Sequence, residues 1–353
     1  MTTRILPLVL ILGTPAAGQE LSPVALGRID AHAHFLAEAK PVLDVLDRLN
    51  VTAVNVCVVD RYDKGYETVA PQHAVARRLA EITRRLPWIA TFDDAGFAEP
   101  GFAGRTLAGV DRALAEGAAG VKVYKSLGME LRDARGAYVL PDDPAFEPVF
   151  AGLATRETPL YAHLAEPIAA WRPLDPKSPD FGYYESYPAW HVHGRAGVPA
   201  KESILAARDR VLAKHPRLRM VGCHLGSMEE DVDEIAKRFE RYPGFAVDTA
   251  GRGAHLTLQP RDKVRSFLLR YSDRVLYATD FGIVPGQDPA EAAARLEAEY
   301  ARDWAYFATG NTIEVDGRKV QGLALPEPVL RALFRGNAER WVPGIAAPPP
   351  SRP

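Results

Sequence analysis

IDAHAH, at residues 29–34, ends a short apolar run in two histidines that are separated by one residue. Successive side chains of a β-strand point to opposite faces, so His32 and His34 lie on the same face of a predicted strand. Two imidazoles on one face can reach a single ion. The stretch therefore predicts part of a metal site at the end of a strand.

Three further apolar runs also end in a titratable side chain. LYAH ends at His163, VGCH ends at His224, and LYATD ends at Asp280. In a barrel of parallel strands the carboxyl ends of all strands meet at one mouth, where catalytic groups gather. The four runs are therefore expected to bring four histidines and an aspartate together.

A larger alternation of strands and helices runs through the chain. Runs such as VTAVNVCVV and GVKVY are separated by helical patterns such as HAVARRLAEITRRL and by a helix predicted to begin with the acids of residues 228–231. This order predicts parallel strands joined by crossover helices. Eight strands are expected, and we predict an α/β fold, a closed (β/α)₈ TIM-barrel. The strands start near Arg28, Val51, Trp88, Gly120, Pro159, Leu218, Phe245 and Arg274.

The longest interruption, from about Leu164 to Ala200, follows the predicted fifth strand and is rich in Pro, Tyr and Trp. Long insertions between a strand and its helix lie on the catalytic face of such barrels. We expect this insertion to form part of the substrate pocket, with Trp190, His191 and His193 as candidate substrate-binding residues. The alternative for these three residues is ordinary packing within the loop.

Length and composition are those of a globular protein. The chain has 353 residues, of which 47% are hydrophobic and 25% charged. A formal net charge of −2 gives no attraction to nucleic acid. Cys57 and Cys223 lie in apolar runs, which excludes a disulfide scaffold. We expect a small-molecule substrate and neither a nucleic acid partner nor a membrane span, and a homo-oligomer is left open.

Both ends of the chain differ from its middle. Arg4, an apolar run from Ile5 to Gly13 and small residues up to Gly18 form the pattern of a secretory signal peptide. The run is too short to span a bilayer, and the alternative is an apolar first strand. We expect a signal peptide at 1–18, one barrel domain at 19–345 and a proline-rich tail at 346–353. The mature protein is then periplasmic or secreted.

The motifs at the strand ends resemble those of the amidohydrolase superfamily. They are DAHAHF, GVKVYK, YAHLAE, GCHLGS and ATDFG on the first, fourth, fifth, sixth and eighth predicted strands, with LFRGNAERW near the end of the chain. The chain is similar to the amidohydrolase-related group (amidohydrolase 2 type) of metal-dependent hydrolases and nonoxidative decarboxylases. The resemblance implies an amidohydrolase-type barrel in which a divalent metal, Zn²⁺ by its nitrogen and oxygen ligands, is bound. The implied ligands are His32, His34, His163 and Asp280.

The predicted fourth strand leaves the number of metal ions open. Lys122 resembles the carboxylated lysine that bridges two metals in binuclear members, but Lys125 stands where a related motif has proline. One ion, or two ions bridged by carboxylated Lys122, are both consistent with the pattern. The alternative is that Lys122 pairs with a carboxylate inside the barrel. Lys125 could hold an anionic group of the substrate.

The resemblance implies a hydrolase that uses a metal-activated water on an amide, ester or lactone-type small molecule. Asp280 would take the proton of that water and pass it to the leaving group, and His224 would stabilise the developing oxyanion or face a second ion. The first alternative is a metal-dependent nonoxidative decarboxylase of an aromatic or unsaturated acid. The second is a non-catalytic metal-binding barrel, which would have lost a ligand.

The signal pattern generates a prediction about the mature chain. We expect that the protein recovered from its native host starts near Gln19, because small residues end the pattern at Gly18. Intact-mass analysis measures this directly. A cellular protein that begins at Met1 or Thr2 would show that the pattern is not processed.

Overall fold

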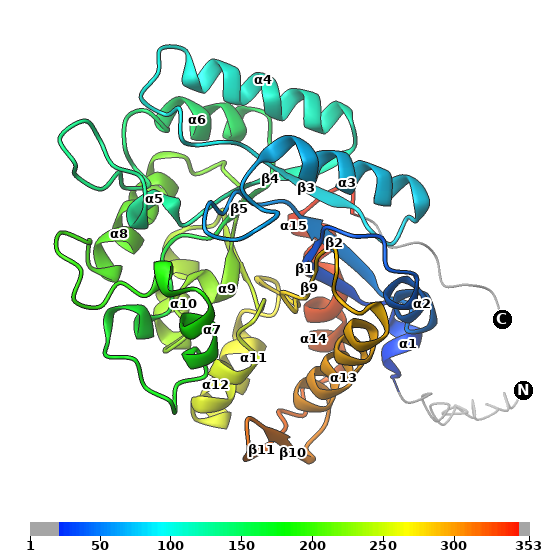
Figure 1. The fold of residues 1–353 in the computed structure, drawn as a ribbon. Helices are drawn as coiled ribbons and strands as arrows, with labels where there is room; N and C mark the ends of the chain where they lie inside the picture. The colour runs from blue at the N-terminus through cyan, green and yellow to red at the C-terminus, as the bar shows by residue number, and fades with distance from the viewer. Residues whose placement is uncertain (1–20, 346–353) are drawn as a thin grey trace, which may run out of the picture.

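The computed structural model of the protein describes residues 21–345 (Figure 1). The predicted signal peptide and the predicted proline-rich tail lie outside the described residues, and both stay predictions. The described part contains one parallel sheet with the strand order β8-β7-β6-β5-β4-β3-β2-β1-β9. Its strands are β1 Ile29–Phe35, β2 Thr52–Val56, β3 Trp88–Thr91, β4 Ala118–Val123, β5 Leu160–Ala162, β6 Met220–Gly222, β7 Phe245–Asp248, β8 Val275–Leu276 and β9 Gly282–Ile283.

The sheet closes on itself through residues 275–283. β8 pairs with β7 at one edge, and β9 pairs with β1 at the other. Between them, the Ala31 N–H donates to the Tyr277 carbonyl and the Asp280 N–H donates to the His32 carbonyl, each at 2.9 Å. β8 and β9 therefore act together as the eighth strand of a barrel, and the predicted (β/α)₈ TIM-barrel is confirmed.

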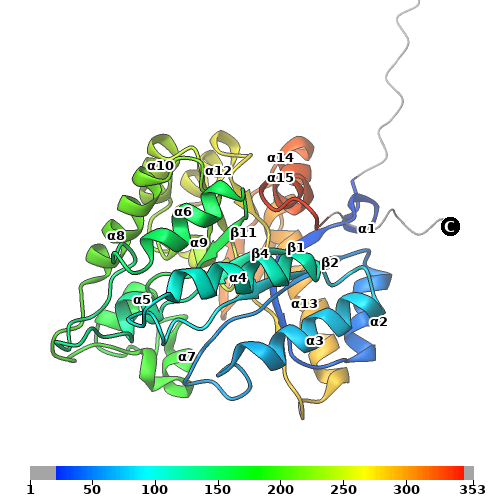
Figure 2. The same ribbon diagram turned by 90° about the horizontal axis from the view of Figure 1, so that it is seen from above.

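Helices surround the barrel, as the two ribbon views show (Figure 2). None of those between residues 21 and 345 is long and apolar enough to cross a membrane. The longer helices are α2 Lys40–Arg48, α3 Val69–Ile82, α4 Phe102–Ala115, α6 Glu147–Thr155, α8 Lys201–Lys214, α10 Val232–Arg241, α12 Arg261–Arg270 and α13 Pro289–Ala308. The shorter ones are α1 Pro23–Leu26, α5 Ser126–Met129, α7 Phe181–Ser186, α9 Cys223–Gly226, α11 Gly253–Leu258, α14 Glu327–Arg331 and α15 Asn337–Trp341, and a hairpin of β10 Thr312–Val315 and β11 Arg318–Gln321 follows α13.

The start of α10 corrects a prediction. The acids at residues 228–231 do not form its first turn, because the helix begins at Val232 and Asp231 caps it by accepting from the Asp233 N–H. Glu229 is instead buried and forms an ion pair with the buried ammonium of Lys201. A long-range ion pair therefore removes these residues from the helix that their sequence favours.

The C-terminal helix α15 packs against the end of the barrel opposite the carboxyl ends of its strands. The Asn337 side chain donates to the Val275 carbonyl at 2.7 Å, and the Trp341 indole N–H donates to the Asp273 carbonyl at 2.9 Å. Trp341 and Ile345 share one buried apolar cluster with inward-facing strand residues such as Ile29. This packing leaves the other end of the barrel as the open one.

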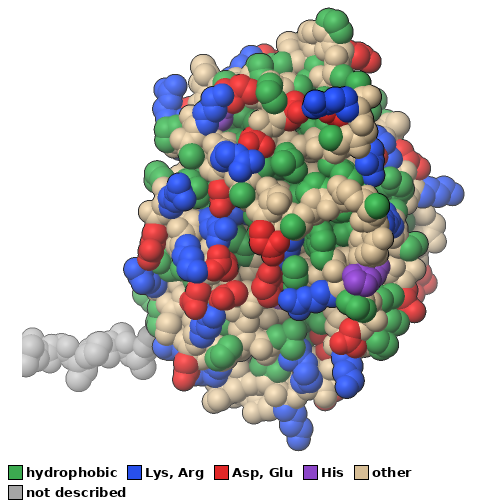
Figure 3. Space-filling model, turned by 90° about the vertical axis from the view of Figure 1, so that its left-hand side faces the viewer, with side chains coloured by type: hydrophobic (Ala, Val, Ile, Leu, Met, Phe, Trp, Pro, Cys, Tyr) green, Lys and Arg blue, Asp and Glu red, His purple; other side chains and the backbone are tan. Residues whose placement is uncertain are grey.

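The segment between β5 and α8 contains short helices only. They are a 3₁₀ turn at Ile168–Trp171, α7, and a 3₁₀ turn at Pro188–Trp190. Residues of this segment, among them Glu166, Tyr183 and Tyr187, line the same cavity as the predicted ligands. On the face drawn in Figure 3, acidic and basic side chains are interspersed rather than gathered into a basic surface.

A buried polar network fixes α13 to the closing strand. The Asp30 carboxylate on β1 accepts from the hydroxyls of Thr279, at 2.6 Å, and Tyr300, at 3.0 Å. The Tyr277 hydroxyl donates to Asp303 on α13 at 2.9 Å. Burial raises the pKa of Asp30 to about 6 despite these donors. Ionisation of a carboxyl group in this network is therefore less favourable than in water.

Glu299 on α13 makes this cost measurable. Burial and, after it, the charge of Asp303 raise the pKa of Glu299 to about 7. A carboxyl group whose pKa is higher in the folded chain than in the unfolded chain stabilises the fold while it is protonated. This stabilisation is complete below the pKa of the unfolded chain and is lost as pH rises through about 7. We expect Glu299→Gln to raise the free energy of unfolding by about 1–3 kcal/mol at pH 8 and to leave it unchanged near pH 4.

Urea denaturation at both pH values tests this expectation. The matched control is Glu297→Gln, because Glu297 is exposed, pairs with Arg48 and has a lowered pKa through that hydrogen bond. The Glu297→Gln variant should not raise the free energy of unfolding at pH 8. Equal stability of Glu299→Gln and the parent protein at pH 8 would contradict the burial argument.

Candidate metal centre

The carboxyl ends of the strands place the predicted ligands around one cavity of about 980 Å³. The ligand candidates that line it come from β1, from the ends of β4, β5 and β6, and from the turn between β8 and β9. They are His34, Lys122, His163, His224 and Asp280. His32, also on β1, is fully buried behind them. The residues that the sequence predicted to converge do converge.

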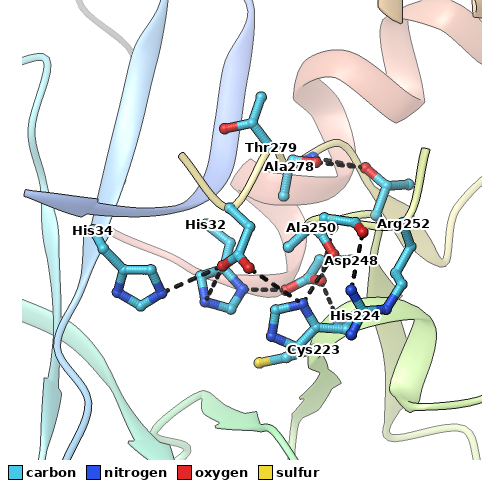
Figure 4. Close-up of polar contacts among 12 residues, drawn as sticks. His32, His34, Cys223, His224, Asp248, Ala250, Arg252, Ala278 and Thr279 are labelled. Atoms are coloured by element: carbon cyan, nitrogen blue, oxygen red, sulfur yellow. Dashed lines mark hydrogen bonds and ion pairs between the residues drawn. The ribbon is translucent and has the colours of Figure 1, made fainter. Parts of the chain in front are cut away.

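The imidazoles surround the carboxylate of Asp280. Its Oδ1 lies 3.4 Å from His34 Nε2 and 3.7 Å from His32 Nε2, and its Oδ2 lies 3.8 Å from His224 Nδ1. Figure 4 shows His34, His32 and His224 as neighbours at the mouth of the barrel. The rings of His163 and His224 are 4.2 Å apart. Four imidazoles and one carboxylate thus meet at the barrel mouth.

The hydrogen bonds of the site leave the atoms that a cation needs. His34 donates Nδ1–H to the Val56 carbonyl at 2.7 Å, so its Nε2 lone pair faces Asp280. His163 Nε2 and Asp280 Oδ1 are buried and have no hydrogen-bond partner within the described chain. Buried acceptors without a donor are unfavourable unless a cation or a proton satisfies them. The residues present therefore fit a divalent metal ion.

Asp248, at the end of β7, orients two of the histidines. It accepts the Nδ1–H of His32 at 2.9 Å and the backbone N–H of His224 at 2.7 Å. Burial, and then the charge of Lys122, lower the pKa of His32 well below its ordinary value, so its imidazole is neutral as a ligand must be. Such a carboxylate fixes the ring orientation of a ligating histidine. The sequence shows Asp248 at a strand end but not this role.

The structure changes the interpretation of His224. Its Nδ1–H donates to the Ala250 carbonyl at 2.9 Å, and burial lowers the pKa of its imidazole to about 3. The Nε2 atom of a neutral ring in this tautomer accepts and does not donate. Its backbone, with φ of +58°, is in the left-handed region, as is that of Asp280 at +68°. Strained backbone of this kind is typical of functional sites.

Lys122 lies deep in the barrel and contacts His32. Its ammonium donates to His32 Nε2 at 2.9 Å, which is the atom that would face a metal ion. No ion pair joins Lys122 to a carboxylate among residues 21–345, contrary to the structural alternative considered for it. An unmodified Lys122 and a metal ion therefore compete for the same lone pair.

Lys125 already has an anionic partner inside the protein. It is fully buried, forms an ion pair with Glu166, and donates to the Tyr183 hydroxyl at 2.6 Å. Its ammonium lies 4.2 Å from the centre of the Trp190 ring. Trp190 itself is buried behind the cavity and donates to Asp60 at 3.1 Å. The predicted anion site at Lys125 is thus neutralised by Glu166, a partner that no sequence pattern indicated.

The two histidines of the insertion lie elsewhere. His191 Nε2 is 3.0 Å from the Arg172 carbonyl, and His193 Nδ1 is 3.1 Å from the Trp171 carbonyl. Neither residue lines the cavity, so the structure does not bring them to the predicted site. These contacts tie the insertion to itself, which is the loop packing that was considered as their alternative.

The chain is similar to a known protein family and to several solved structures. A family model described as "Amidohydrolase" matches residues 29–344. A solved structure described as an amidohydrolase II is similar with a TM-score of 0.51, 18% identity, and coverage of 89% of this chain and 99% of that one. No match was found among curated proteins. The structural similarity supports the barrel fold alone.

Two further structures are similar at lower scores. An uncharacterized TIM-barrel protein from Bordetella bronchiseptica has a TM-score of 0.49 and 15% identity, with 90% of this chain and 99% of that chain covered. A 2,6-dihydroxybenzoate decarboxylase from Rhizobium has a TM-score of 0.48 and 16% identity, with 90% and 98% covered. Neither similarity bears on the chemistry of this chain.

The site generates a prediction about metal content. We expect the purified protein to bind at least one divalent ion per chain, and His163→Ala to lose it, because a ligand atom is removed. Asp248→Asn should weaken metal affinity by about 10–100-fold, because His32 loses the acceptor that orients it. Elemental analysis after dialysis against a metal buffer measures both effects.

The matched control is His191→Ala, a histidine of the same chain outside the cavity, which should keep its metal. Thermal melting in the presence of a chelator checks that the variants fold. Full metal content in His163→Ala would show that the ligand set is assigned wrongly.

Proposed function

The chain belongs to the amidohydrolase family, and from that premise we propose that it is a metal-dependent hydrolase of small-molecule amides, esters or lactones. One observation carries the proposal. Two buried polar atoms, His163 Nε2 and Asp280 Oδ1, have no partner within residues 21–345 and lie in the wall of a large cavity beside further imidazoles. Candidate ligand atoms that line an open cavity support a catalytic ion rather than a closed structural one.

His32, His34, His163 and Asp280 would hold the ion, and three imidazoles with one carboxylate suit Zn²⁺. When bound, a divalent cation at such a site polarises a carbonyl group and lowers the pKa of a coordinated water. Lys122 bears on the number of ions. As an amine it hydrogen-bonds to His32, whereas a carboxylated Lys122 would offer two oxygens to a second ion.

Asp280 is the proton acceptor in this proposal. Burial works against its charge, but the electrostatic effect of the surrounding imidazoles, His224 first, outweighs burial and holds the pKa of Asp280 well below its usual value. The carboxylate is therefore ionised and can take a proton from an attacking water. It can then return that proton to the leaving group. Its backbone N–H, bonded to the His32 carbonyl, keeps it in place.

His224 has a different role from the oxyanion donor that its motif implies. Because its Nδ1–H is held by Ala250, its Nε2 can accept a hydrogen bond from the attacking water. That contact would orient the water toward the carbonyl carbon. The developing charge on the substrate would then be stabilised by other groups in the cavity wall.

The proposal predicts the effect of removing the proton acceptor. Asp280→Asn keeps the size of the side chain but cannot take a proton, so we expect kcat to fall by about 10²–10⁴. Metal content has to be measured in parallel, because Asp280 is also a proposed ligand. The matched control is Asp316→Asn, another aspartate of the cavity wall, which should change kcat by less than about threefold.

The competing chemistry is nonoxidative decarboxylation of an aromatic or unsaturated acid. We propose to screen esters, lactones and amides beside such acids in ¹⁸O-labelled water. Hydrolysis places a solvent oxygen in the product, and we expect this result. Release of CO₂ with a solvent proton on carbon and no solvent oxygen in the organic product would establish decarboxylation instead.

A further inference from the structure

Arg252 is a cation of the cavity wall that nothing in the proposed mechanism uses. It follows β7, directly before α11, and lines the same cavity as the ligand candidates. Its side chain makes one hydrogen bond within residues 21–345, from Nη1 to the carbonyl of the adjacent Gly251 at 2.9 Å. Its Nε atom is buried and has no partner there. A guanidinium can donate five hydrogen bonds, so most of its capacity is unused.

The backbone holds Arg252 close to the proposed proton acceptor. Gly251, with φ of +59°, donates its N–H to the Thr279 carbonyl at 3.0 Å. A Cβ atom at Gly251 would lie only 3.3 Å from Asp280 Oδ2, so glycine permits this close approach. In Figure 4 the Arg252 side chain extends beside His224. The loop therefore places a guanidinium at the edge of the candidate metal centre.

Three other cations of the cavity wall make contacts within the described chain. Lys125 pairs with Glu166, and Lys122 donates to His32. Arg295 donates to the Gly282 carbonyl at 2.9 Å. Arg252 forms no ion pair with any carboxylate in the described chain. Lys64 of the same wall likewise forms none within residues 21–345, so the position of Arg252 beside Asp280, rather than the lack of an ion pair alone, makes it the candidate for binding a ligand.

The acids around Arg252 keep it charged without binding it. Burial opposes its charge, yet the carboxylates of Glu229, Asp180 and Glu166 raise the pKa of Arg252 above its ordinary value. The two of these acids that line the cavity have their own donors. Glu166 accepts from Lys125, and Asp180 lies 3.1 Å from His255 Nε2. The guanidinium is thus a permanent cation that faces the cavity with free donors.

We propose that Arg252 binds a carboxylate of the substrate that does not react, so that the substrate is an acid carrying a hydrolysable ester, amide or lactone group. A planar guanidinium matches a carboxylate with two parallel hydrogen bonds. The inference rests on the proposed function, because it places the reacting group at the candidate metal centre. Arg252 then fixes the distance between the reacting group and the charge, which makes it a specificity residue.

The test uses two ligands of the same shape that differ by one charge. They are isophthalate, with two carboxylates, and 3-carbamoylbenzoate, in which one carboxylate is an amide. Calorimetric titration into the metal-loaded protein gives both dissociation constants without any catalysis. We expect the parent protein to bind isophthalate about 10–100-fold more tightly, as a charge-assisted hydrogen-bond pair implies.

Arg252→Gln should reduce this preference to less than about threefold while keeping the metal content of the parent. Arg252→Lys keeps the charge without the planar fork and should show a preference between the two. The matched control is Arg295→Gln, which removes another arginine of the same wall and should keep the full preference. If Arg252→Gln loses metal, Arg252→Lys takes its place in the comparison with the parent protein.

A parent protein without preference, or an Arg252→Gln variant that retains it, would overturn the proposal. So would an Arg252→Lys preference no greater than that of Arg252→Gln. The outcome is independent of the reaction assigned above. Preference for the dianion in a protein that hydrolyses nothing would leave the anion site standing and remove the hydrolase. Hydrolysis of uncharged esters without any such preference would support the hydrolase and contradict the anion site.

Discussion

Closure of the barrel at residues 275–283 is the constraint on which the site depends. This segment leaves its pairing with β7 after Leu276 and resumes pairing with β1 at Gly282. The backbone bond from Asp280 to the His32 carbonyl bridges the interval. Because the last strand must reach the first, the carboxylate of Asp280 is carried to the two histidines of β1. Barrel closure and assembly of the ligand set are therefore one structural event.

The second determinant of the site is the hydrogen bonding of its buried polar atoms. At the mouth of the barrel, the Nδ1–H group of each of three histidines donates to a fixed acceptor. The acceptors are Asp248 for His32, the Val56 carbonyl for His34 and the Ala250 carbonyl for His224. These bonds choose a tautomer for each ring and leave the opposite nitrogen unprotonated. Burial keeps the rings of His32 and His224 neutral because it disfavours the charged imidazolium and lowers the pKa of both. Backbone and carboxylate contacts have thus prepared lone pairs before any ligand arrives.

Some charged groups of the cavity wall form ion pairs within the described chain, and others, including Arg252, do not. Lys125 and Glu166 neutralise each other under the aromatic rings of Tyr183 and Trp190, and they stiffen the insertion where it meets the barrel. Within residues 21–345, the side chain of Arg252 hydrogen-bonds only to its own backbone neighbour, Gly251. In a low-dielectric cavity an unpaired charge is costly unless a ligand meets it. The distribution of ion pairs, rather than the number of charges, thus decides which side chains remain available for binding.

The sequence by itself determined the barrel, the order of its strands and the convergence of His32, His34, His163, His224 and Asp280. These features follow from local periodicity, because each apolar run of a parallel barrel delivers its next polar residue to the same mouth. Only the tertiary structure decided which partner each polar side chain takes. Asp248 orients His32, Glu166 neutralises Lys125, and His191 and His193 remain outside the cavity. Such partners are far apart in the chain and are chosen by three-dimensional packing and desolvation, which no local pattern encodes.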